Sequence, residues 1–219
     1  MNIRISNILI AFIFVSINHI ALAEISIDSL GTGWSEANYA LKDDAQGSAF
    51  EKLIKQADQY VSDNSGDAKG WIWRGIIKSS FAGAKGGLGA LSLAKAAKED
   101  LNKAISINEN SLSGSAHASL GILYAKVPGW PFGFGSDVQA EKHLIKALEI
   151  NPDGVDPNFF YGEFLYEETR KYNKAKKYLL KAQASVPAKI TPLADEKRQK
   201  EISVLLLKVE KKIQRKRRR

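Results

Sequence analysis

The chain has 219 residues, 44% of them hydrophobic and 26% charged, which is the composition of an ordinary globular protein. It contains no cysteine, and this excludes disulfide bonds, thiol catalysis and zinc–thiolate sites. The formal net charge of +8 is concentrated at the C-terminal end, because residues 208–219 hold eight basic residues and one acid. Arg4 supplies the remaining positive charge, so residues 24–207 carry no net charge.

The first segment, residues 1–23, is predicted to be a secretory signal peptide. Arg4 gives it a positive start, residues 8–17 form an apolar run, and the sequence ALA at residues 21–23 is an A-x-A cleavage site. The alternative is an uncleaved membrane anchor, but the apolar run is about half of the ~20 residues that a spanning helix needs. We therefore expect a mature chain that begins at Glu24 and resides outside the cytoplasm, in a periplasm.

Residues 24–190 contain a repeated apolar pattern. Two copies have spacings of four, three and five residues: Ala140, Leu144, Ala147 and Pro152 in one, and Ala175, Leu179, Ala182 and Pro187 in the other. Weaker copies begin at Ala97 and at Phe50. Spacings of four and three keep these residues on one face of a helix. The small alanines on that face allow a second helix to approach closely.

A glycine motif lies upstream of the copies that begin at Ala97, Ala140 and Ala175, and it predicts the helix that packs on each of them. The motifs are centred on Gly75, Gly121 and Gly162, and the one in Leu120-Gly121-x-x-Tyr124 is typical of the first helix of a tetratricopeptide unit. We therefore predict an all-α fold of tetratricopeptide-like helical hairpins, an α-solenoid with three complete units and a half unit at the start. An irregular helical bundle is the alternative.

Two units carry extra residues between the two helices, and we expect both insertions to be long turns. The first includes residues 81–93, FAGAKGGLGALSL, and the second includes residues 127–135, VPGWPFGFG. The first lacks the spacing of a phosphate-binding loop, because Lys85 precedes the glycine pair. Insertions at equivalent turns emerge on one side of a solenoid, which is often its binding side.

The second insertion and the segment Phe159–Tyr161 contain the aromatic residues that we predict to bind a ligand or partner, since aromatic anchors dominate interface energies. These candidates are Trp130, Pro131, Phe132, Phe134, Phe159, Phe160 and Tyr161. The alternative is that the loop folds back and seals the groove of its own protein. His117 and His143 could act as ligands or bases only if they meet in space with a carboxylate. No catalytic, metal or cofactor arrangement stands out, so we expect no enzyme and no cofactor.

Residues 191–219 are predicted to form a terminal helix that covers the last repeat and ends in a basic tail. Thr191 and Pro192 suit its first positions. The tail is a candidate for contact with anionic lipid or lipopolysaccharide, because the predicted signal peptide argues against nucleic acid. Its basic candidates are Lys211, Lys212, Arg215, Lys216, Arg217, Arg218 and Arg219. A solvated, disordered end is the alternative.

Several of these motifs together resemble the T-component (TatT) family, whose members are associated with tripartite ATP-independent periplasmic (TRAP) transporters. They are GILY at residues 121–124, VPGWPFGFG at 127–135, AEKHL at 140–144, NPDGVDP at 151–157 and FYG at 160–162. AKGGLGAL at residues 84–91 is similar to segments of related periplasmic helical proteins. The resemblance covers roughly residues 46–187, which coincides with the repeats.

The resemblance implies a non-enzymatic tetratricopeptide protein that docks a substrate-binding protein and holds a hydrophobic ligand in a central passage. It also implies a trimeric assembly, as in some members. Unlike the lipoproteins among them, this chain has no cysteine. We therefore expect a soluble periplasmic interaction protein that serves as the auxiliary component of a TRAP-type transporter. The alternative is an envelope scaffold that its basic tail holds near anionic lipid.

Overall fold

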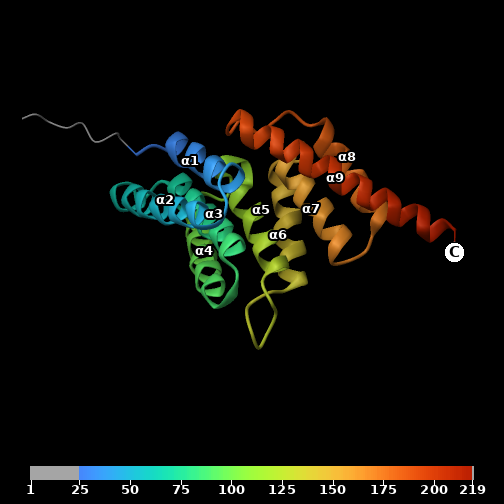
Figure 1. Cartoon of the computed structure of the whole chain (residues 1–219), viewed down its shortest axis with the longest axis horizontal. Helices are drawn as coiled ribbons and strands as arrows, with labels where there is room; N and C mark the ends of the chain where they lie inside the picture. The colour runs from blue at the N-terminus through green and yellow to red at the C-terminus, as the bar shows by residue number, and fades with distance from the viewer. Residues whose placement is uncertain (1–24, 219) are drawn as a thin grey trace, which may run out of the picture.

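The computed structural model describes residues 25–218, so the predicted signal peptide and Arg219 lie outside the described residues. Within this range the chain is helical and contains no β-strand (Figure 1). The helices follow one another in the order α1 (Ile27–Tyr39), α2 (Asp43–Asp63), α3 (Ala68–Lys85), α4 (Gly87–Asn108), the short 3₁₀ helix η1 (Ser111–Gly114), α5 (Ser115–Lys126), α6 (Asp137–Ile150), α7 (Val155–Glu167), α8 (Tyr172–Ala184) and α9 (Pro192–Arg217). The predicted all-α class is confirmed.

Consecutive helices pack in pairs. Helix α3 packs on α4, α5 on α6 and α7 on α8. The first helices of these pairs also contact one another, α3 with α5 and α5 with α7, so they form an inner layer. Helices α4, α6 and α8 pack on this layer and, among the residues that the structure describes, do not contact one another.

A glycine–leucine contact recurs where the two helices of a pair cross. A β-carbon added to the glycine would lie 2.7, 2.5 and 2.8 Å from the leucine Cγ in the pairs Gly75–Leu101, Gly121–Leu144 and Gly162–Leu179. Carbon atoms do not approach this closely without displacement, so a glycine allows each crossing. The prediction that these glycines mark the crossings is confirmed.

Helix α1 completes a fourth pair with α2, so the prediction of a half unit at the start is wrong. Ser26 begins α1 with a capping box, in which its Oγ accepts a 3.1 Å hydrogen bond from the backbone N of Ser29. Leu30 and Trp34 are buried, and a β-carbon at Gly33 would lie 2.6 Å from Cδ2 of Leu53. The glycine–leucine contact therefore also occurs in this pair.

The first predicted insertion is not a long turn, and this prediction is wrong. Helix α3 continues to Lys85 and α4 begins at Gly87, with positive φ values of 62° at Gly86 and 64° at Gly87. Phe81 is buried, and the alanine and leucine residues around it favour helix. The extra residues of 81–93 therefore lengthen two helices instead of loosening the turn between them. The second predicted insertion is a loop, as expected.

The predicted terminal helix is present as α9, and its first turns reach α1. Oγ1 of Thr191 caps the helix by accepting a 3.0 Å hydrogen bond from the backbone N of Ala194. Ala194 packs in the same hydrophobic cluster as Leu30 and Trp34 of α1, whereas Ile202 and Val209 pack against α7 and α8. The first and last helices of the array therefore contact each other (Figure 1).

Candidate functional site

A cavity of about 800 Å³ lies between the inner helices and the segment that joins α8 to α9. Small-molecule sites are typically ~300–1,000 Å³ in volume and lined mainly by apolar and aromatic side chains with a few polar groups. The apolar lining includes Trp34, Trp73, Ile76, Phe160 and Ile190. The size and lining of this cavity therefore suit an apolar or amphipathic molecule.

The two tryptophans that line the cavity are held in place by other side chains. Trp34 comes from α1 and Trp73 from α3, and their ring centroids are 5.8 Å apart. The indole Nε1 of Trp34 donates a 2.8 Å hydrogen bond to Oγ of Ser80. Because this bond and the packing fix both rings, the aromatic wall is formed before any ligand arrives.

The turn before α5 adds a strained piece of backbone to the cavity wall. Leu112 and Ser113 both line the cavity, and their φ values of 46° and 54° lie in the left-handed region. Each such residue costs about 1 kcal/mol. Oγ of Ser115 donates a 2.6 Å hydrogen bond to the carbonyl oxygen of Leu112, which helps to hold the turn. Strain of this kind is concentrated at functional sites.

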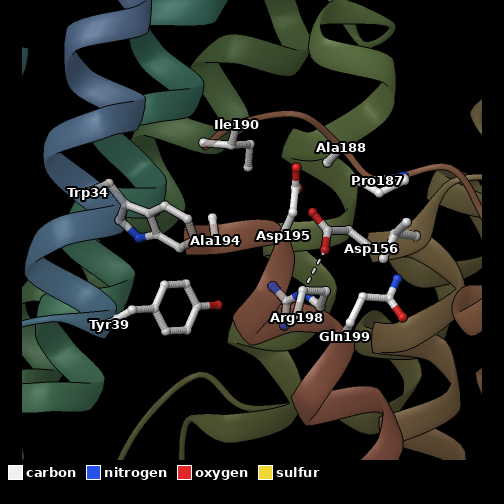
Figure 2. Close-up of a pocket in the computed structure, with 11 residues that line it drawn as sticks. Trp34, Tyr39, Asp156, Pro187, Ala188, Ile190, Ala194, Asp195, Arg198 and Gln199 are labelled. Atoms are coloured by element: carbon white, nitrogen blue, oxygen red, sulfur yellow. Dashed lines mark hydrogen bonds and ion pairs between the residues drawn. The ribbon is translucent and has the colours of Figure 1, made fainter. Parts of the chain in front are cut away.

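Arg198 joins α9 to α7 at the side of the cavity, beneath the α8–α9 connection (Figure 2). Its Nε donates a 2.8 Å hydrogen bond to Oδ1 of Asp156, and its Nη1 donates a 2.6 Å hydrogen bond to Oε2 of Glu201. The guanidinium carbon also lies 4.6 Å from the ring centroid of Phe159 and 4.8 Å from that of Phe160. Two carboxylates and two aromatic faces therefore hold this cation in one position.

The charge of Arg198 is stabilised by its neighbours. Burial opposes the charge, but Asp156, Tyr39 and Glu201 outweigh burial and raise the pKa of the guanidinium. Burial also raises the pKa of the Tyr39 hydroxyl to about 12, although Arg198 acts to lower it. Arg198 and Tyr39 line a smaller pocket beside the main cavity (Figure 2). Arg198 is therefore a permanent cation, and its first role is to join helices.

The predicted aromatic loop, residues 127–135, lies at the other ends of α5 and α6 and does not line the cavity described above. Trp130 is 90% exposed and Phe132 is 78% exposed, and Pro131 is exposed between them. Phe134 instead packs edge-on against Tyr124, with ring centroids 5.5 Å apart. The loop thus points two aromatic rings into solvent and anchors itself by the third.

The close approach of its two arms explains the glycines at the end of the loop. The backbone N of Gly135 donates a 2.9 Å hydrogen bond to the carbonyl oxygen of Pro128. A β-carbon at Gly135 would lie 1.8 Å from the carbonyl oxygen of Val127, and one at Gly133 would lie 2.4 Å from that of Pro128. No side chain fits at these contacts, so the hairpin requires glycine.

The other predicted aromatic residues lie in α7, and within the described residues the structure does not bring them together with the loop. Phe160 lines the cavity, whereas Phe159 and Tyr161 are buried in the cluster between α7, α8 and α9. The hydroxyl of Tyr161 donates a 3.0 Å hydrogen bond to Oε1 of Glu141. Burial is the main cause of the raised pKa of this hydroxyl. Of the seven aromatic-loop and α7 candidates, Phe160 is therefore the one at the cavity.

His117 and His143, the two histidines among the described residues, are in contact, which the sequence alone does not predict. Nδ1 of His117 lies 2.9 Å from Nδ1 of His143, and Nε2 of His117 lies 3.5 Å from Oε2 of Glu109. Burial lowers the pKa of both rings, that of His143 to about 4, where the neighbouring His117 adds to the effect. Among residues 25–218 no group of three or more potential ligands is placed to hold a metal ion. The pair therefore connects α5 with α6 in its neutral form.

A scan against models of protein families finds no match, and a search of curated proteins finds none either. The resemblance to the T-component family therefore stays a prediction from the quoted motifs. In the part of the chain that the structure describes, no helix is both long and apolar enough to cross a membrane.

Three residues that line the cavity, Trp34, Trp73 and Arg198, were not predicted from the sequence. Trp34 was missed because α1 lacks the repeat motif, although Leu30, Trp34 and Ala37 have the four-three spacing of a buried helical face. Trp73 lies between the recognised motif residues of α3. Arg198 stands in a charged stretch that is typical of a solvated helix face. Its partner Asp156 lies 42 residues away, and no local pattern indicates that contact.

Proposed function

We propose that this chain is a non-enzymatic binding protein built from tetratricopeptide-like repeats, which carries a small apolar or amphipathic ligand in its central cavity. The single observation that carries this proposal is the 800 Å³ cavity with Trp34, Trp73 and Phe160 in its wall. Rigid aromatic walls favour apolar molecules because they offer a large contact area at low entropic cost. The recurring glycine–leucine contacts support the repeat assignment.

A cavity-filling variant tests ligand binding. Ser119 is half-buried in α5 and lines the cavity, so a phenylalanine there would occupy its volume. Ser106 is exposed on α4, and Ser106→Phe is the matched control. With the neutral apolar probe N-phenyl-1-naphthylamine, we expect the wild type and Ser106→Phe to bind and Ser119→Phe to bind at least about tenfold more weakly. Equal probe binding by both variants would contradict the proposal.

We further propose that a protein partner docks on the aromatic loop, and that this partner is the solute-binding protein of a TRAP-type transporter. The specific observation in favour is the exposure of Trp130 at 90% and Phe132 at 78% within the loop, and of Val138 at 76% in the first turn of α6. Exposed aromatic residues next to one another are typical interface anchors. The transporter assignment itself derives from the motif resemblance, and the periplasmic location from the predicted signal peptide.

The docking proposal can be tested separately from ligand binding. Mature protein, residues 24–219, and its Trp130→Ala/Phe132→Ala variant are immobilised and exposed to periplasmic extract. We expect the wild type to retain a solute-binding protein that mass spectrometry identifies, and the variant to lose it. Retention of the same solute-binding protein by both forms would exclude the loop as the docking surface while leaving the cavity proposal unaffected.

A further inference from the structure

The outer side of α8 and α9 carries exposed aliphatic side chains among basic ones. Leu180 of α8 is 46% exposed, and Val204 and Leu207 of α9 are 45% and 68% exposed. Single exposed aliphatic residues are common, but a group of them at one place marks an interaction surface. We call these three residues the aliphatic strip.

The register of the two helices places the strip along one seam. Helices α8 and α9 run antiparallel (Figure 1), and Nζ of Lys176 on α8 lies 2.7 Å from Oε1 of Glu210 on α9. Leu180 follows Lys176 by four residues and Leu207 precedes Glu210 by three. Because the helices are antiparallel, moving forward by four residues on α8 and backward by three on α9 advances about one helical turn in the same direction. Leu180 and Leu207 therefore lie side by side. Val204 continues the strip one turn further along α9.

Basic side chains border the strip. Lys177 on α8 and Lys200, Lys208, Lys211 and Arg215 on α9 are all exposed. The four on α9 follow one another at steps of eight, three and four residues, which keeps them on the outward face of the helix. Among residues 25–218 none of these five lies within 4.0 Å of a carboxylate. The surface is therefore a basic field with an aliphatic centre.

Helix α9 keeps this field ordered up to the end of the described chain. The helix extends to Arg217, so residues 208–217, which the sequence left open to a disordered end, are helical. Its opposite face is covered by its own protein, since Leu205, Leu206 and Val209 are buried. The basic face of α9 therefore points outward and is supported by the rest of the protein. Because the apolar face of α9 is already buried, the helix can lie on another surface but cannot insert deeply into it.

We propose that this surface docks on an anionic lipid bilayer, with α9 parallel to the membrane plane. The basic residues neutralise lipid phosphates, and the aliphatic strip enters the headgroup boundary. The charge complementarity identifies an anionic partner, and the strip distinguishes a bilayer from nucleic acid. Aliphatic side chains find apolar surroundings at a bilayer, whereas single-stranded nucleic acid is bound on aromatic rings, and the strip has none.

The test measures sedimentation of the mature chain, residues 24–219, with vesicles of phosphatidylcholine alone or mixed with phosphatidylglycerol. We expect binding to the mixed vesicles only. The variant Lys200→Gln/Lys208→Gln/Lys211→Gln/Arg215→Gln should bind them roughly 10²–10³-fold more weakly. The matched control is Lys52→Gln/Lys55→Gln/Lys95→Gln/Lys103→Gln, which removes the same charge from exposed positions on α2 and α4. It should change binding by less than about threefold.

A second variant separates a bilayer from other polyanions. Val204→Ser/Leu207→Ser retains every charge, and we expect it to bind the mixed vesicles roughly tenfold more weakly while binding to heparin and duplex DNA stays unchanged. Circular dichroism of each variant confirms that it is folded. The proposal is overturned if the control variant loses as much vesicle binding as the α9 variant. It is equally overturned if the serine variant binds the mixed vesicles as well as the wild type does.

Discussion

Oγ of Ser35 in α1 lies 2.6 Å from Oγ1 of Thr191, the residue that caps α9. The two residues are 156 positions apart in the chain, so this hydrogen bond joins the beginning of the helical array to its end. Ser35 is 1% exposed, and an unpaired hydroxyl at such a position is costly. The same threonine oxygen accepts the hydrogen bond from the backbone N of Ala194.

Thr191→Val removes both hydrogen bonds while keeping the shape of the side chain. We expect the free energy of unfolding to fall by about 1–3 kcal/mol, since a helix cap contributes about 1 kcal/mol and Ser35 is left unpaired. Urea unfolding followed by circular dichroism measures this change. Thr191→Ser retains the hydroxyl and should stay within about 0.5 kcal/mol of the wild type. A loss of the same size in both variants would contradict the assigned role of the hydroxyl.

Stability should decrease as the pH falls below about 6.5, because of His117 and His143. Burial lowers the pKa of both in the folded protein, to about 4 for His143, so between pH 6.5 and 4 the unfolded chain binds more protons than the folded one. Because the ring of His143 is partly exposed and Glu109 lies beside His117, we expect the loss to be less than about 1 kcal/mol per pH unit.

Urea midpoints between pH 7.5 and 5.0 measure this decrease. His143→Gln retains a polar side chain beside His117 but cannot titrate in this range, so its stability should depend less on pH than that of the wild type. Equal pH dependence in the two proteins would show that other groups cause the loss of stability.

Two glycines inside helices should respond to alanine in opposite ways. At Gly121 a β-carbon would lie 2.5 Å from Cγ of Leu144, whereas at Gly83 in α3 it would point into open space. We expect Gly121→Ala to lower the free energy of unfolding by about 1–3 kcal/mol and Gly83→Ala to raise it by about 0.5–1 kcal/mol. Thermal or urea unfolding measures both. Stabilisation by Gly121→Ala would contradict the close crossing of α5 and α6.

The aromatic residues of the loop should divide into one that stabilises the fold and two that do not. Phe134 packs on Tyr124, and Nζ of Lys98 lies 4.4 Å from its ring centroid, so Phe134→Ala should cost about 1–3 kcal/mol. Trp130→Ala and Phe132→Ala should stay within about 0.5 kcal/mol, because both side chains are exposed. Urea unfolding midpoints of the three variants test this prediction. Equal destabilisation by Trp130→Ala and Phe134→Ala would contradict it.

The sequence predicts the paired helices well because their packing is local. Leu101, Leu144 and Leu179 are each 0% exposed, as the repeated spacing predicts, and each meets a glycine of the preceding helix. The prediction of a long turn at residues 81–93 is wrong because the alanine and leucine residues there favour helix more strongly than the glycines oppose it. Only Gly86 and Gly87 form the turn.

The candidate site is less predictable because distant segments form it. Phe160 is the sequence-predicted residue that lines the cavity, and its partners there include Trp34 of α1 and Ile190 of the α8–α9 connection. No spacing rule relates residues so far apart in the chain. The exposure of Trp130 likewise depends on how the hairpin of the loop is directed, which the composition of residues 127–135 does not determine.

The contact between α1 and α9 affects how the protein unfolds. In an open array each repeat touches only its neighbours, so the terminal repeats fray first and cooperativity declines with length. Here neither α1 nor α9 can detach without breaking its contacts with the other, in the cluster that Ala194 shares with Leu30 and Trp34. Amide hydrogen exchange in α1 and in the first turns of α9 should consequently occur through one shared opening event, and the two segments should have similar protection factors.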